Sequence, residues 1–224
     1  IEKFIQFYSP DKIELYKKMR DSGEPDDELT KALQKDDVDK AQSIITQTNL
    51  NINDFIVPFN IFDGGFLLNI RMKLIDYAAA FGSVSCFKYL KLSHSEIDDI
   101  TFIYAIYGGN TEIIQIVDQN IGNKESKPQE KKSFSLALCL NTIVKAISKH
   151  KNDIFDWVLE QKFSPNGEKI ANSILQKSVD NGNAHAFIEV ADKYVTNYDF
   201  QELFETACAK GFYKLATLIF DISD

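Results

Sequence analysis

The chain has 224 residues, 44% of them hydrophobic, which is enough to bury a substantial core in one or two domains. Its formal net charge is −8. A negative field of this kind argues against DNA, RNA or an anionic membrane as the main ligand. No apolar run approaches the ~18 residues that a membrane-spanning helix needs, so we expect no membrane insertion.

The three cysteines, Cys86, Cys139 and Cys208, are odd in number and far apart in sequence. This pattern provides neither a disulfide framework nor a metal-binding knuckle. We therefore expect reduced and mostly buried thiols in an intracellular, cytoplasmic protein.

The N-terminal segment contains a helix start at Ser9, Pro10 and Asp11, in which serine serves as the cap and proline takes the first helical position. An apolar face follows, and the polar run 21–25 ends the helix. We expect residues 1–25 to form a helical cap that covers the exposed end of whatever follows.

A helix-turn-helix pattern is clearest in segment 74–90, where one apolar helical run ends at Gly82 and another begins two residues later. The same register recurs six times. Relative to the turn residue, position −7 is apolar, −4 is Ala or Ser, +5 is apolar and +8 is aliphatic. The six turn residues are Asp36, Gly82, Gly109, His150, Gly182 and Gly211.

The kind of residue found at each position has a physical cause. Residues three apart share one helical face, so each pair of positions predicts a buried stripe. The small residue at −4 allows the next helix to approach closely. The turn residue separates two antiparallel helices and is expected to adopt positive φ, which glycine tolerates best and which Asp and His also tolerate. Six unrelated amphipathic helix pairs are the alternative interpretation.

Two long connections interrupt the register. In the insertion 49–72, the β-prone runs 55–62 and 66–70 flank Asp63-Gly64-Gly65, which predicts a hairpin. Its aromatic residues either form a binding lip or fold over the first two repeats as core. The second insertion, 120–133, is polar and lysine-rich and predicts a mobile surface loop.

Segment 105–114, Ala-Ile-Tyr-Gly-Gly-Asn-Thr-Glu-Ile-Ile, resembles the centre of an ankyrin repeat. Segments 180–183 and 207–211 resemble the same turn. Segment 74–90 is similar to a divergent ankyrin-like domain of unknown function found in protist ankyrin-repeat families. The resemblance implies an all-α, ankyrin-like helix-turn-helix solenoid of about six degenerate repeats. It would form one continuous domain over 26–224.

The sequence departs from the ankyrin pattern because no repeat has the Thr-Pro-Leu-His start. Reshaped repeats, or HEAT or armadillo geometry, therefore stay open as alternatives. The last helix pair is as apolar as the others, which predicts further repeats after it or self-association through this uncapped end.

No motif indicates catalysis or metal binding. The chain lacks a Gly-x-Ser-x-Gly elbow, a His-Glu-x-x-His helix and a phosphate loop. Its three histidines, His94, His150 and His185, fall in different units. The acidic runs 26–28 and 36–39 are typical of helix caps and solvated surface. We expect no enzyme activity, no cofactor and no metal.

By resemblance, the partner is another protein, bound on the concave face through the two positions before each turn. Phe81 and Tyr107 occupy such positions in adjacent repeats, outside the core stripes, and would be natural hot spots. The alternative is that both rings pack against the next repeat. The candidate binding residues are Phe81, Tyr107, Lys149, Asp180, Asn181 and Lys210.

We therefore predict a non-enzymatic protein-interaction scaffold. The alternative function is a regulatory or recruiting segment of a larger enzyme or effector whose catalytic part lies outside this chain.

Overall fold

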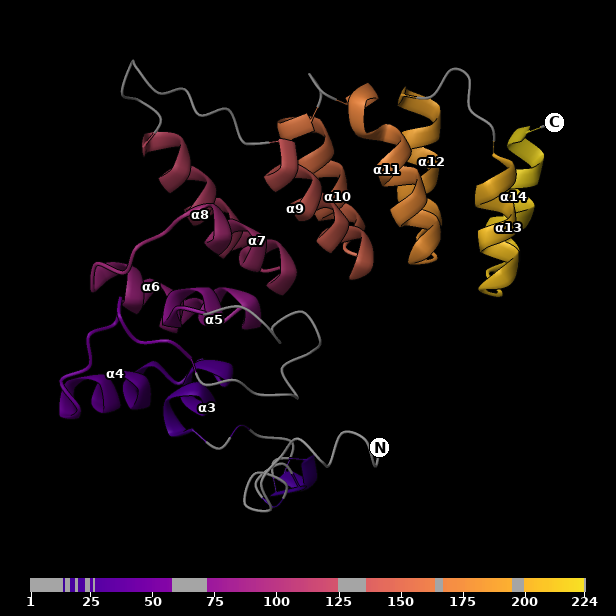
Figure 1. Cartoon of the computed structure of the whole chain (residues 1–224). Coiled ribbons are helices and arrows are strands. Elements are labelled where there is room, and N and C mark those ends of the chain that lie inside the picture. The colour runs from indigo at the N-terminus through magenta and orange to yellow at the C-terminus, as the bar shows by residue number, and fades with distance from the viewer. Residues whose placement is uncertain are drawn as a thin grey trace. The chain divides into compact units, whose positions relative to one another are not determined.

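The structure is a computed structural model (Figure 1) that describes residues 27–57, 72–124, 136–163, 167–194 and 200–223, with a few single residues before Asp27. Of the predicted cap, 1–25, the structure describes only residues 14, 17, 18, 20–22 and 25, and all of these except residue 25 are helical. Within the described residues, every regular element is a helix, which confirms the all-α prediction. The chain divides into two compact units, 1–115 and 116–224. The single continuous domain over 26–224 stays a prediction.

The helices occur in pairs around the six predicted turns. The pairs are α3 (Glu28–Gln34) with α4 (Val38–Gln47), α5 (Leu74–Phe81) with α6 (Val84–Leu92), α7 (Asp99–Gly108) with α8 (Thr111–Lys124), α9 (Leu136–Ser148) with α10 (Asn152–Val158), α11 (Gly167–Asp180) with α12 (Ala184–Tyr194), and α13 (Gln201–Ala209) with α14 (Tyr213–Ser223). A short π-helix, η1 (Leu159–Phe163), extends α10.

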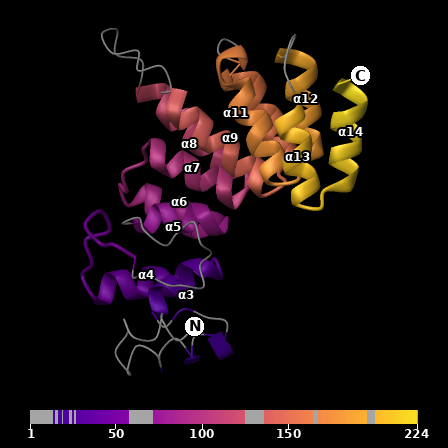
Figure 2. The same ribbon diagram turned by 45° about the vertical axis from the view of Figure 1, so that its right-hand side comes forward.

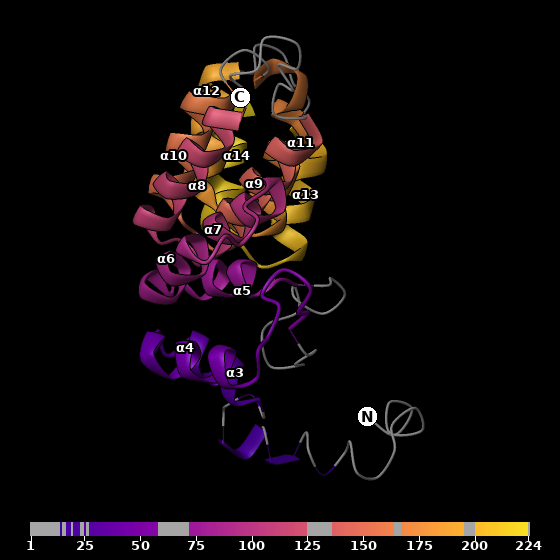
Figure 3. The same cartoon turned by 90° about the vertical axis from the view of Figure 1, so that its left-hand side faces the viewer.

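Each unit has two layers, formed by the first and by the second helices of its pairs. In residues 1–115, α5 packs against α3 and α7, while α4 packs against α6. In residues 116–224, α11 packs against α9 and α13, while α10 packs against α12. Figure 3 shows α9, α11 and α13 on one side of this unit and α10, α12 and α14 on the other, and Figure 2 shows α14 beside α13.

All six predicted turn residues have positive φ, between 51° and 75°, which confirms the expected left-handed turn. At five of them the turn N–H donates to the carbonyl at −3, and the next N–H donates to the carbonyl at −4. At the sixth, the Gly109 N–H donates to the Ala105 carbonyl, 2.9 Å away. These bonds satisfy the last carbonyls of each first helix.

The predicted core positions are buried with two exceptions. Every residue at −4 and +5 is at most 5% exposed. Ile44 at +8 and Phe204 at −7 are only half-buried, and their neighbours Ile45 and Leu203 are buried instead. The sequence register also missed a buried position at −3. Its members in the first five pairs are Leu33, Ala79, Ile106, Ile147 and Val179, each 0% exposed.

Neighbouring pairs are joined by polar groups at their turns. The Asp36 carboxylate accepts hydrogen bonds from the N–H groups of Ser85 (3.1 Å) and Cys86 (2.8 Å), in the first turn of α6. A carboxylate at a helix N-terminus is favourable, since those N–H groups have no partner within the helix. Asn183 similarly donates through Nδ2 to the Ile147 carbonyl at 3.2 Å.

Three predictions need correction or lie partly outside the described residues. The loop expected from residue 120 begins later, because 120–124 continue α8; the remainder of 120–133 is outside the described range. Cys86 is buried as expected, but Cys208 is exposed. Most of the predicted hairpin, 58–71, also lies outside.

The described ends of the 49–72 insertion pair with each other. Ile56 and Lys73 form an antiparallel bridge, and the Val57 N–H donates to the Met72 carbonyl at 2.8 Å. Val57 and Met72 are buried at this base, so the ends of the insertion contribute to the core.

A substitution at Gly108 tests the close packing between α5 and α7. A Cβ added there would lie 2.1 Å from the Ala79 carbonyl oxygen. Glycine to alanine inside a helix normally stabilises by up to ~1 kcal/mol. We expect Gly108→Ala instead to lower the free energy of unfolding by about 1–3 kcal/mol through overpacking. Urea denaturation measures the change. Lys149→Ala, at the same register position of the α9 pair, should stay within about 0.5 kcal/mol of the parent. A stabilised Gly108→Ala protein would contradict this packing.

Candidate functional site

The exposed face of the first helices is the candidate binding surface. Five of the six first helices bury positions −7, −4 and −3, and positions −5, −2 and −1 lie on the opposite side of the helix. In α11, for example, Leu175, Ser178 and Val179 are fully buried, whereas Lys177 is exposed and Asp180 is half-buried. The predicted partner-binding residues all occupy −2 or −1.

Position −5 differs between the two units. In residues 1–115 it holds the half-buried Lys31 on α3, and Tyr77 on α5 and Tyr104 on α7, each only 1% exposed. In residues 116–224 it holds Lys145, Lys177 and Thr206, which are exposed or half-buried. The surface therefore includes −5 as well as −2 and −1 in residues 116–224, but not on α5 and α7.

Phe81 is the large apolar residue of this surface in α5. It is 38% exposed, and its ring centroid lies 4.6 Å from that of Tyr77, one helical turn earlier. The Tyr77 hydroxyl accepts a hydrogen bond from Gln34 Nε2 at 2.7 Å. Phe81 therefore rests on an anchored, buried ring and exposes part of its own ring to solvent.

Tyr107 lies on α7, the neighbour of α5, two residues before its turn. It is half-buried. Between it and the turn, Gly108 faces the end of α5. Neither Phe81 nor Tyr107 is fully buried, so both retain surface for a partner, and their binding role stays a prediction.

Three other predicted residues form one hydrogen-bonded group between α11 and α13. Lys210 Nζ contacts the Asp180 carboxylate at 3.0 Å and its carbonyl at 2.9 Å. Lys177 Nζ lies 3.1 Å from the same carboxylate. Asn181 Nδ2 donates to the Lys177 carbonyl at 2.8 Å. Burial acts to raise the pKa of Asp180, but hydrogen bonds from Lys210, Lys177 and Gln176 outweigh it and hold that pKa below its ordinary value.

Lys149 is exposed at the end of α9, at the register position of Asn181 and Lys210. Sequence reasoning missed Lys145 and Lys177, which lie four residues before Lys149 and Asn181 on the same helical face. The sequence pattern could have revealed these two lysines, because they occupy position −5 in two consecutive pairs. Burial and the nearby charge of Lys149 lower the pKa of Lys145.

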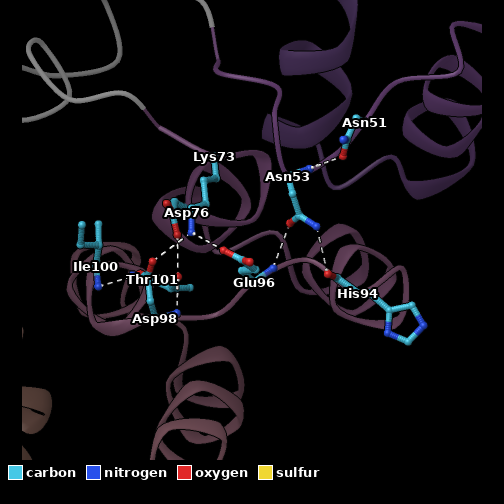
Figure 4. A network of polar contacts seen from close by, with 9 residues as sticks. All are labelled: Asn51, Asn53, Lys73, Asp76, His94, Glu96, Asp98, Ile100 and Thr101. Atoms are coloured by element: carbon cyan, nitrogen blue, oxygen red, sulfur yellow. Dashed lines mark hydrogen bonds and ion pairs between the residues drawn. The ribbon is translucent and has the colours of Figure 1, made fainter. Parts of the chain in front are cut away.

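A buried polar network joins the starts of α5 and α7 (Figure 4). Asp76 is 2% exposed, and its carboxylate accepts a hydrogen bond from Thr101 Oγ1 at 2.7 Å. The Asp98 carboxylate caps α7 by accepting from the N–H groups of Ile100 and Thr101. It also pairs with Lys73 Nζ at 2.9 Å.

The same network reaches the loop after α6. Asn53 donates through Nδ2 to the His94 carbonyl at 3.2 Å and accepts at Oδ1 from the Glu96 N–H at 3.1 Å. His94 has positive φ there, so this histidine serves a turn. Because each of these contacts joins two segments of the fold, we interpret the network as structural.

Burial raises the pKa of Asp76 to about 6, despite the hydrogen bond from Thr101; the Asp98 charge raises it further. For Lys73, pairing with Asp98 outweighs burial and raises the pKa above its ordinary value. The Lys73 ammonium thus pairs with Asp98, and the more deeply buried Asp76 holds its proton more tightly.

Two further features bear on the kind of site. His185 Nε2 lies 2.8 Å from the Asp156 carboxylate, which joins α12 to α10. Among the described residues, no group of three His, Cys, Asp or Glu side chains is arranged to hold a metal ion, and no helix has the length and apolar character needed to cross a bilayer.

Comparison with known proteins gives no match: no protein-family model, no curated protein and no solved structure is similar to this chain.

The Asp76 network predicts a pH-dependent stability. Because the folded pKa of about 6 lies above the ordinary aspartate value of 3.8, the ionised carboxylate destabilises the fold. Stability should be greatest below about pH 4 for this group and fall as the pH rises through 6, by about 2–3 kcal/mol in total. Urea unfolding between pH 4 and pH 8 measures it.

Asp76→Asn should remove this slope, since the amide oxygen still accepts from Thr101 and carries no charge. Asp36→Asn is the control: the pKa of Asp36 is lowered by hydrogen bonds from Cys86 and Ser85 that outweigh burial. Removing the Asp36 charge should leave the pH dependence of the unfolding free energy above pH 5 unchanged. An unchanged slope in Asp76→Asn would refute the assignment.

Proposed function

We propose that this chain is a non-enzymatic, ankyrin-like scaffold that binds another protein through the exposed face of its first helices. The observation that carries the proposal is Phe81, an aromatic ring that is 38% exposed and lies tilted against the ring of the buried Tyr77. Binding hot spots are typically aromatic residues held rigidly by their surroundings. A side chain held in this way loses little conformational freedom when a partner covers it.

The repeated helix pairs support the same proposal. Within each pair, positions −2 and −1 lie at the end of the first helix, away from the core positions. Side chains at these outer positions change from pair to pair without disturbing the fold, from the ring of Phe81 to the charge of Lys149 and Lys210. Such a surface suits selective recognition by shape and charge. The buried thiol of Cys86 is in keeping with the cytoplasmic location that we propose.

Affinity capture from the native cell tests the scaffold function. Phe81→Ala and Tyr107→Ala should each reduce recovery of the bound protein, because truncating an interface hot spot costs about 2 kcal/mol or more of binding energy. Both variants should keep their unfolding free energy within about 1–2 kcal/mol of the parent. The matched control is Leu92→Ala on the second helix α6, which is 80% exposed and should bind normally. Equal recovery with all three variants would rule out this surface.

Self-association through the last pair is a second candidate function, favoured by exposed side chains on α13 and α14. Position −3 is fully buried in the first five pairs, but its counterpart in the sixth, Cys208, is exposed. Phe220 of α14 is 52% exposed. A Cβ on Gly182 would meet the Phe212 ring of the next pair, whereas one on Gly211 meets no described atom within 4 Å. A second copy would cover this side as another helix pair does elsewhere.

Sedimentation velocity over a range of concentrations tests this second candidate. The parent chain should form dimers as concentration rises, and Phe220→Asp should remain monomeric, because a charge buried in an apolar contact is costly. Leu92→Asp, an equal change on an exposed residue of α6, should dimerise like the parent. A parent chain that stays monomeric throughout would exclude self-association through this side.

A further inference from the structure

Lysines recur along the exposed face of the three first helices in residues 116–224. Lys145 and Lys149 lie on or directly after α9, Lys177 on α11 and Lys210 directly after α13. Lys149, Lys177 and Lys210 are exposed, and Lys145 is half-buried. All four occupy position −5 or −1, which are one helical turn apart and therefore on the same face. We refer to these four residues as the lysine stripe.

The stripe is continuous across helices, because α11 packs against both α9 and α13 (Figure 1). Asp180 fixes two of its members by contacting Lys177 at 3.1 Å and Lys210 at 3.0 Å. Other carboxylates on α13, Glu202 and Glu205, lie one to two turns before Lys210, towards the start of the helix.

Positive charge is therefore in local excess in a chain whose net charge is −8. At positions −5, −2 and −1 of these three pairs, four lysines accompany the carboxylate of Asp180. The proximity of Lys149 and Lys145 is unfavourable, since each charge disfavours the other. An anionic ligand laid along the stripe would relieve this repulsion.

We propose that the lysine stripe binds an extended, acidic peptide segment of the partner protein, with carboxylates at about every third residue. This inference rests on the proposed scaffold function and names the chemistry of its partner. Charge complementarity selects the ligand, as oppositely charged surfaces do in protein complexes.

The spacing follows from helix packing. Neighbouring helices lie about 8–10 Å apart. An extended peptide advances about 3.3 Å per residue, so three residues span one helix-to-helix step. Glutamates at every third position would therefore meet α9, α11 and α13 in turn. A run of three contiguous glutamates is too short to reach all three helices. Its carboxylates would lie near two helices at most.

A peptide is favoured over nucleic acid because of the whole-chain charge. A nucleic acid carries one negative charge every few ångströms along its whole length, so the net negative charge of this protein repels the part that extends beyond the stripe. A short peptide with spaced carboxylates carries much less charge outside the stripe. Single-stranded DNA is therefore included as a competing probe.

Fluorescence anisotropy with the full chain tests the proposal. The probes are labelled glycine-serine peptides with three glutamates at every third position, three contiguous glutamates, or three lysines at every third position, together with oligothymidylate. The spaced glutamate peptide should bind at least about threefold more tightly than the contiguous one, and the lysine peptide should not bind. Each exposed ion pair contributes about 1.4- to 5-fold to affinity. The triple variant Lys149→Gln, Lys177→Gln, Lys210→Gln should therefore bind about tenfold more weakly.

Lys193→Gln is the control for a lysine outside the stripe, since Lys193 lies on the second helix α12 and pairs with Glu189. It should bind the spaced peptide like the parent. Equal affinity for the spaced and contiguous peptides, tighter binding of oligothymidylate, or full binding by the triple variant would each overturn the proposal. If no acidic peptide binds while protein capture still depends on Phe81, the stripe proposal fails and the scaffold function stands.

Discussion

The structure depends on one backbone constraint, a left-handed residue between the two helices of each pair. Six residues with φ between 51° and 75° reverse the chain, and their N–H groups satisfy carbonyls at the end of the first helix. Where the turn residue is not glycine, its side chain can take on a second task. Asp36 has the required positive φ and also caps α6 in the next pair. At Asp36, the turn residue therefore both reverses the chain between two helices and connects that helix pair to the next one.

The exposed face follows from the same register. Once positions −7, −4 and −3 are committed to packing, the side chains at −2 and −1, and at −5 in residues 116–224, are released from the core. Phe81 and the lysine stripe both occupy these released positions. The buried Asp76 network shows the contrast: its polar groups bind one another and hold helices together. The groups around the buried Asp76 thus serve the fold, whereas we propose that Phe81 and the lysine stripe serve a partner.

The turns and most of the core could be predicted because they depend on local chemistry: glycine or another tolerant residue at the turn, and apolar residues at helical spacing. The predicted burial was wrong at Ile44 and Phe204, where an adjacent apolar residue, Ile45 or Leu203, takes the buried position instead. The joints between pairs were harder to predict. The close approach at Gly108, the cap from Asp36 and the Lys210–Asp180 pair depend on how two distant segments meet, and a single sequence does not encode that in its periodicity.

Partner binding on the first-helix face, and not on the second-helix face, is tested most directly by hydrogen–deuterium exchange on the captured complex, compared with the free chain. We expect slower exchange at the ends of first helices, in α5 and α7 or in α9, α11 and α13, with α6, α10 and α12 unchanged. Protection confined to the second helices would contradict binding on the first-helix face.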